Sequence, residues 1–160
     1  ELKQAFGLKR VLWVDSGSLS GDDTDSHIDI LARFCDPETI AYLKSEDAED
    51  PDYEGLMNME AQLKSFRTPD GKPYRLVPLP KPEQMFLDDY PLPASYANFL
   101  IINGAVLVPG SGSELDEVAR ARLQEVFTDR EVIVIDCRPL LSGHGGLHCV
   151  TMQYPEGWLE

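Results

Sequence analysis

Apolar positions in the first half of the chain recur with two spacings, which predict several strands and one helix. Alternating or continuous apolar runs predict strands over residues 10–14, 28–35, 39–43 and 74–79. Apolar residues three and four apart predict a helix over residues 53–66. The Asp-Pro-Glu sequence at residues 36–38 is typical of a turn, so we expect the strands beside it to form a hairpin. A polar loop rich in Gly, Ser and Asp leads from the opening strand to His27.

The second half repeats the order strand, strand, helix, strand. Strands are expected over residues 97–102, 105–108 and 131–135, with a helix over residues 113–127. Asn103 and Gly104 separate the first two strands and form the strongest short signal for a hairpin. Such an internal repeat is typical of modular architectures, for example blades around an axis. Rings of blades usually hold four or more, so we expect this chain to be part of a larger assembly. A proline-rich connector at residues 79–93 is expected to be extended and to cover part of a cleft.

Composition indicates one globular domain with an acidic surface. The chain has 160 residues, of which 42% are hydrophobic and 26% are charged. Its net charge of −14 would repel nucleic acid and anionic membranes and attract small cations, although a merely well-solvated surface explains it equally well. No run approaches the roughly 20 apolar residues that a membrane-spanning helix needs. No signal peptide is recognisable and residue 1 is not Met, so we expect further sequence upstream.

The three cysteines favour a reducing compartment, and we expect a cytoplasmic protein. Their number is odd and no Cys-x-x-Cys spacing occurs, so a disulfide framework is not expected. Cys35 and Cys137 end apolar runs and are interpreted as small buried hydrophobic residues. Cys149 differs because it lies among glycines and histidines, where a thiol can be approached.

His27 and Asp29 stand two residues apart on a predicted strand. Residues i and i+2 of a strand point to the same face, so both side chains would enter the same space. There, an imidazole can transfer protons near neutral pH and a carboxylate can hold a cationic group. A structural ion pair at the junction of loop and strand is the alternative.

Cys149 follows two glycines in a loop that we expect over residues 140–150. Glycines let backbone amides and a substrate approach closely, and protonated His144 or His148 would favour the thiolate. A buried structural cysteine is the alternative. Zinc ligation by these histidines, His27, Asp29 and Cys149 is disfavoured because the spacing matches no familiar ligand pattern. No Gly-x-Ser-x-Gly sequence supports a serine hydrolase.

Several of these segments together resemble the agmatine deiminase family, the bacterial-type peptidylarginine deiminase branch of the guanidine-modifying superfamily. The resemblance rests on four sequences in the same order, namely DTDSHID at residues 23–29, ASYANF at 94–99, NGAV at 103–106 and GLHCVTMQ at 146–153. It implies an α/β fold of ββαβ repeats in a five-bladed propeller, of which this chain would hold two to three blades. Residues 1–160 would then be the C-terminal part of a single catalytic domain, because the family's N-terminal carboxylate segments are absent.

The same resemblance implies roles for the three candidate residues. Cys149 would be the nucleophile, His27 the general acid and base, and Asp29 the carboxylate that grips a guanidinium group. No cofactor or metal is implied.

The implied reaction is hydrolysis of agmatine to N-carbamoylputrescine and ammonia, a step of polyamine biosynthesis. Peptidyl-arginine is the second substrate choice, and a truncated module that binds cations without turnover is the rival from another class. The expected partners are a small guanidino substrate and the missing N-terminal half, without nucleic acid or membrane, and homo-oligomerisation is left open.

Overall fold

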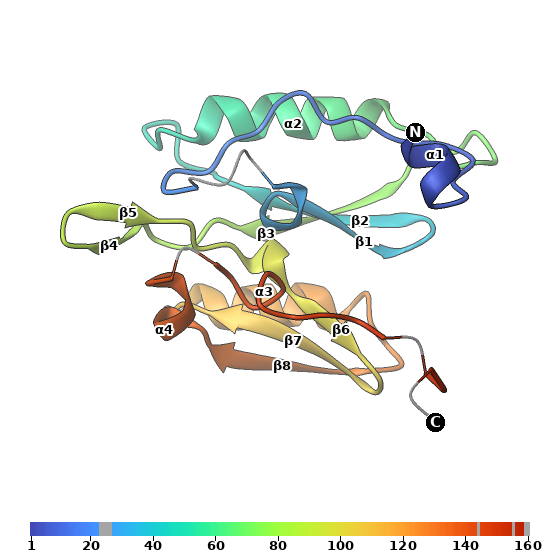
Figure 1. Ribbon diagram of the computed structural model, residues 1–160. Coiled ribbons are helices and arrows are strands. Elements are labelled where there is room, and N and C mark those ends of the chain that lie inside the picture. Colours follow the sequence, from blue (N-terminus) through green and yellow to red (C-terminus); the bar gives the residue numbers. More distant parts are fainter. Residues whose placement is uncertain (23–26, 144, 155, 159–160) are drawn as a thin grey trace.

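Two similar units of strand, strand, helix and strand make up most of the chain, as Figure 1 shows. The computed structural model describes residues 1–22, 27–143, 145–154 and 156–158. The first unit contains β1 (Ala32–Asp36), β2 (Thr39–Lys44), α2 (Tyr53–Ser65) and β3 (Arg75–Pro80). The second contains β6 (Leu100–Ile102), β7 (Ala105–Gly110), α3 (Leu115–Gln124) and β8 (Glu131–Asp136). In each unit the first two strands are antiparallel and the third pairs in parallel after the helix, so the predicted repeat is confirmed.

The remaining elements are short and flank or connect the two units. They are α1 (Leu2–Ala5), the 3₁₀ helix η1 (Ile28–Ile30), β4 (Met85–Leu87), β5 (Tyr90–Leu92), the 3₁₀ helix η2 (Tyr96–Asn98) and α4 (Arg138–Leu141). None of the helices within the described ranges has the length and apolar character needed to cross a membrane.

The strand predicted over residues 10–14 is wrong. This segment joins none of the three sheets and instead runs along α2, as the blue trace in Figure 1 shows. Side chains hold it there, since the amide of Asp15 donates to Gln62 Oε1 at 2.9 Å and the Arg10 guanidinium bonds to Tyr74 Oη at 3.0 Å. Of its apolar residues, Val14 packs against the core cluster that includes Leu56 and Met59 of α2, whereas Trp13 is 65% exposed.

The central strand of the first sheet, β2, is buried on both faces. On one face, Leu56, Met59 and Leu63 of α2 pack against β2 with 2% exposure or less. On the other face, Leu79 packs with Phe99 and further apolar side chains of the second unit. Complete burial of one such side chain is worth about 1.5–3 kcal/mol, so this shared core joins the two units firmly.

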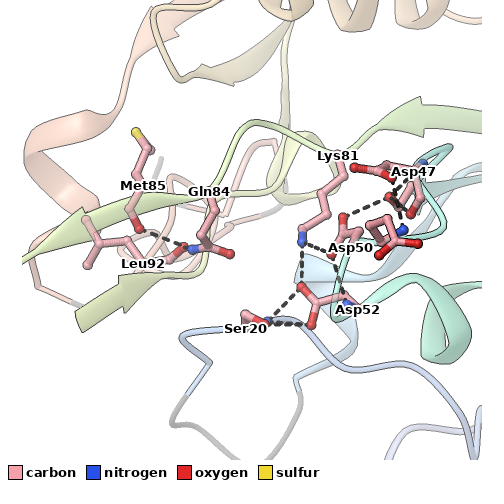
Figure 2. Close-up of polar contacts among 10 residues, drawn as sticks. Ser20, Asp47, Asp50, Asp52, Lys81, Gln84, Met85 and Leu92 are labelled. Carbon is pink, nitrogen blue, oxygen red and sulfur yellow. Dashed lines mark hydrogen bonds and ion pairs between the residues drawn. The ribbon is translucent and has the colours of Figure 1, made fainter. Parts of the chain in front are cut away.

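The proline-rich connector is not simply extended, contrary to expectation. It folds into the projecting hairpin of β4 and β5, whose turn residues Asp88 and Asp89 have φ angles of 48° and 64°. Gln84 closes the base of this hairpin, because its Nε2 donates to the carbonyls of Met85 and Leu92 at 3.1 and 2.9 Å (Figure 2). Pro93, directly after the hairpin, reaches the cavity described below.

A buried ion cluster lies at the start of α2 and holds Ser20. Lys81 Nζ lies 2.6 Å from Asp50 Oδ1 and 2.7 Å from Asp52 Oδ2, and its side chain is only 7% exposed (Figure 2). The Asp52 carboxylate also accepts hydrogen bonds from the amide and hydroxyl of Ser20. Removing one partner of such a buried pair leaves an uncompensated charge, so the cluster holds Ser20 strongly.

Candidate active site

His27 and Asp29 lie on a 3₁₀ turn, not on the strand that the alternating pattern predicted. Asp29 is the middle residue of η1, and His27 is its N-cap residue with extended backbone angles. The strand begins only at Ala32, after the chain has turned at Leu31. His27 and Asp29 therefore do not share the face of a strand. Both side chains nevertheless line the same cavity.

A cavity of about 360 Å³ brings the three predicted site residues together. His27, Asp29 and Cys149 all line it, together with Asp22, Ile30, Pro93, Gly146, His148 and Thr151. A larger cavity of about 810 Å³ lies beside α3 and the β4–β5 hairpin. Its wall mixes acidic and basic side chains but contains neither a thiol nor an imidazole, so the smaller cavity is the better candidate for chemistry.

The Asp29 carboxylate is the centre of the polar contacts in the site. Its Oδ2 lies 2.7 Å from His148 Nδ1, 3.1 Å from Asn98 Nδ2 and 3.6 Å from Cys149 Sγ. Burial raises the pKa of Asp29, but the interactions with His148, Cys149 and Asn98 outweigh burial and hold this pKa below its usual value. Asp29 is therefore a carboxylate at neutral pH.

Asn98 organises the three residues around it. Its side chain is 1% exposed. The Nδ2 group donates to Asp29 and, at 3.4 Å, to Cys149 Sγ, while Oδ1 accepts from the His148 amide at 2.8 Å. The resemblance assigns no role to Asn98, although this residue lies in the ASYANF sequence that carries it. A polar residue within an otherwise apolar stretch was the signal for it.

Cys149 is the one cysteine with a thiol at the cavity. Cys149 is exposed, whereas Cys137 is buried and Cys35 is partly buried, which agrees with the predicted contrast between them. Burial raises the pKa of the Cys35 thiol to about 12 and also raises that of Cys137. These two thiols are poor nucleophiles, because a thiol reacts as its thiolate.

The two histidines that line the cavity have different surroundings. His148 pairs with Asp29, which we had not expected from the sequence. His27 lines the same cavity, and no side-chain hydrogen bond of its imidazole is found among the described residues. His144, also considered as a neighbour of the thiol, lies outside the described residues. Among the residues that the structure does describe, no group of three or more His, Cys, Asp or Glu side chains is arranged to hold a metal ion.

Comparisons with known proteins agree with the resemblance drawn from the sequence. A model of the Porphyromonas-type peptidyl-arginine deiminase family matches residues 1–155. A Legionella pneumophila protein provisionally named agmatine deiminase is 33% identical over 154 residues, which are 96% of this chain and 44% of that protein. An agmatine deiminase of Stutzerimonas stutzeri is 30% identical and is covered over 46% of its length.

Two solved structures extend the comparison to three dimensions. A Porphyromonas gingivalis protein provisionally described as an arginine deiminase has a TM-score of 0.95 and 60% identity, over 98% of this chain and 46% of that one. A C. jejuni agmatine deiminase with one cysteine replaced by serine, determined with substrate bound, has a TM-score of 0.86 and 40% identity. The match covers 92% of this chain and 43% of that structure.

The chain spans a little under half the length of the relatives it matches, as the resemblance to a C-terminal half implied. The mixed α/β character is confirmed, whereas a propeller of five blades stays a prediction. Because the family model matches almost all of its residues, the chain belongs to the Porphyromonas-type peptidyl-arginine deiminase family.

Proposed function

We propose that the protein to which this chain belongs hydrolyses the guanidino group of a small cationic substrate, with agmatine as first choice. One observation carries the proposal: the Cys149 thiol lies 3.6 Å from the Asp29 carboxylate in a cavity that His27 also lines. A nucleophile, an anion and a proton carrier are the groups that deimination requires.

Asp29 holds and orients the substrate. Within the described contacts, His148 and Asn98 occupy Oδ2, which leaves Oδ1 to accept a charge-assisted hydrogen bond from the guanidinium. Because Sγ and the carboxylate are close, a guanidinium held by Asp29 has its central carbon next to the thiol. Binding to Asp29 therefore places the guanidinium carbon in position for attack by Cys149 Sγ.

Cys149 then forms a covalent bond with that carbon. The thiolate sulfur adds to the central carbon, and the bond from this carbon to one terminal nitrogen breaks. His27 supplies the proton with which that nitrogen leaves as ammonia. An S-alkylthiouronium remains attached to Cys149, and His27 is left neutral.

Water completes the reaction. Neutral His27 takes a proton from a water molecule, whose oxygen adds to the thiouronium carbon. As the carbon–sulfur bond breaks, the added hydroxyl loses its proton to solvent, which releases the ureido product, returns Cys149 as its thiolate and leaves His27 protonated for the next cycle. For agmatine the products are N-carbamoylputrescine and ammonia.

Agmatine is favoured over peptidyl-arginine for two reasons. Relatives of this chain are named agmatine deiminase, and the cavity of about 360 Å³ suits a small molecule. The free thiols are also consistent with a cytoplasmic protein, where agmatine is a precursor of polyamines. Contact with the N-terminal half of the domain, and homo-oligomerisation, remain parts of this proposal.

The test is to incubate the intact protein with agmatine or with a peptide containing arginine, and to assay ammonia and ureido product. We expect N-carbamoylputrescine from agmatine, and no turnover by Cys149→Ala. Ammonia release with the arginine peptide, but not with agmatine, would make the protein a peptidyl-arginine deiminase. Binding of agmatine without ammonia release would favour the non-catalytic module and contradict the proposal.

A further inference from the structure

Residues 29–33 and residues 95–99 are joined by three side-chain links, which we call the clamp. In the first link, Asn98 Nδ2 bonds to Asp29. In the second, Ser95 Oγ donates to the Ile30 carbonyl at 2.6 Å, and in the third, Arg33 Nη1 donates to the Phe99 carbonyl. The links reach the cavity only through Asp29 and Ile30, because the side chains of Asn98, Ser95 and Arg33 do not line it.

Ser95 uses both hydrogen-bonding abilities of its hydroxyl. The side chain is 5% exposed, and its oxygen also accepts from the amide of Ala97 at 3.1 Å, which caps η2. One buried hydroxyl therefore begins the helix that carries Asn98 and ties it to the helix that carries Asp29. A methyl group in its place would leave the Ile30 carbonyl and the Ala97 amide without these partners.

Arg33 makes the link at the other end of the clamp. Its guanidinium stacks over the Phe99 ring, 5.0 Å from the centroid, besides bonding to the carbonyl of the same residue. No carboxylate of the described residues lies within ion-pair distance of it. Burial lowers the pKa of Arg33, and the negative charge of Asp29 opposes this change, so the two charges interact. Arg33 thus ties β1 to the second unit beside the site.

We propose that Ser95 and Arg33 are positioning residues, which fix the Asp29 carboxylate relative to Asn98 and Cys149. The inference rests on the proposed deiminase function. The helices η1 and η2 have only three residues each, so they have little stability of their own and depend on cross-links. A displacement of about 1 Å in such a site can cost about 100-fold in rate.

The test compares Ser95→Ala and Arg33→Met with the conservative variants Ser95→Thr and Arg33→Lys in the intact protein. Ser45→Ala is the matched control for serine, since Ser45 is also 5% exposed and donates to Asp50 at 2.8 Å but does not line the cavity. Arg122→Met is the control for arginine, because Arg122 Nη1 bonds to the Pro78 carbonyl at 2.7 Å.

Two readouts separate positioning from general stability. The first is kcat and KM with agmatine. The second is the ratio of Cys149 alkylation rates with a cationic haloacetamidine and with neutral iodoacetamide. Asp29 attracts only the cationic reagent, so this ratio reports the position of the Asp29 carboxylate relative to the Cys149 thiol. The measurement does not require turnover.

We expect Ser95→Ala and Arg33→Met to lower kcat by about 10- to 100-fold and the alkylation ratio by about tenfold. Ser95→Thr should keep much of the wild-type kcat and alkylation ratio. The control variants should leave the alkylation ratio unchanged, even where their melting temperatures fall. An unchanged ratio in Ser95→Ala and Arg33→Met, or equal falls in the controls, would overturn the proposal. If wild-type protein releases no ammonia, the proposed function fails, while the ratio still tests the clamp.

Discussion

Gly146 lies so close to Asn98 that a Cβ atom on Gly146 would fall 2.2 Å from Asn98 Oδ1. A carbon and an oxygen that are not bonded cannot come that close, so the glycine is required for the Asn98 amide to reach both Asp29 and Cys149. The space that Asn98 occupies therefore explains why Gly146, the second of the two glycines before Cys149, has no side chain.

Gly146→Ala should displace the Asn98 amide and with it the contacts to Asp29 and Cys149. We expect kcat to fall by about 100-fold, measured by ammonia release. Gly145→Ala is the matched control, because a Cβ there would make an ordinary contact of 3.6 Å with Cys149 Cβ. Equal loss of activity in the two variants would argue against this steric role.

Asp29→Asn should raise KM and also lower kcat. The neutral amide neither attracts the guanidinium nor orients it, and an interaction that does both affects both constants. Steady-state kinetics with agmatine measures the two effects. Unchanged kinetics would remove Asp29 from the site.

The two histidines at the cavity should respond differently to substitution by asparagine. His27→Asn should lower kcat by about 100- to 10,000-fold, because the group that carries the proton is lost. His148→Asn should have a smaller effect, since it removes a partner of Asp29 but no step of proton transfer. If His148→Asn is the more damaging change, the proton carrier is His148.

The sequence predicted the elements that depend on long periodic patterns. The helix α2 and the strands β2, β3, β7 and β8 were expected within one or two residues of their observed ends, whereas β1 and β6 begin four and three residues later than expected. Hydrophobic periodicity is informative there because each element buries one regular face in the core. The free thiols and their different burial were also foreseeable from neighbouring residues.

The geometry of the site could not be predicted in the same way. The segments around His27 and Asn98 were both expected to be strands, yet both form 3₁₀ turns that end before the strands begin. Such short turns depend on cross-links like that of Ser95 with Ile30, which join residues 65 positions apart. Local patterns carry no information about contacts of that range.

Asp116 should make the stability of the protein depend on pH. Its carboxylate accepts hydrogen bonds from Tyr96 Oη at 2.6 Å and from the amides of Ser111 and Gly112 at 2.8 and 2.9 Å. Burial raises the pKa of Asp116, but these bonds outweigh burial and lower it below 3.8. A lowered pKa in the folded state stabilises the protein above the ordinary value of 3.8, and this stabilisation is lost as pH falls through the folded pKa.

Asp116→Asn should therefore cost about 2 kcal/mol of unfolding free energy at neutral pH and less in acid. Urea unfolding at neutral pH and at a pH below 3.8 measures the difference from wild type. Asp129→Asn, at a carboxylate that is 70% exposed, should change little at either pH. A cost for Asp116→Asn that does not depend on pH would contradict the assignment.

Mass spectrometry of the protein, quenched in acid during turnover of agmatine, tests the covalent role of Cys149 most directly. We expect an adduct on Cys149 with the mass of agmatine less one ammonia, which disappears when the substrate is exhausted. Cys149→Ala should remain folded and carry no adduct. Turnover by Cys149→Ala, or an adduct found only on Cys35 or Cys137, would contradict the mechanism.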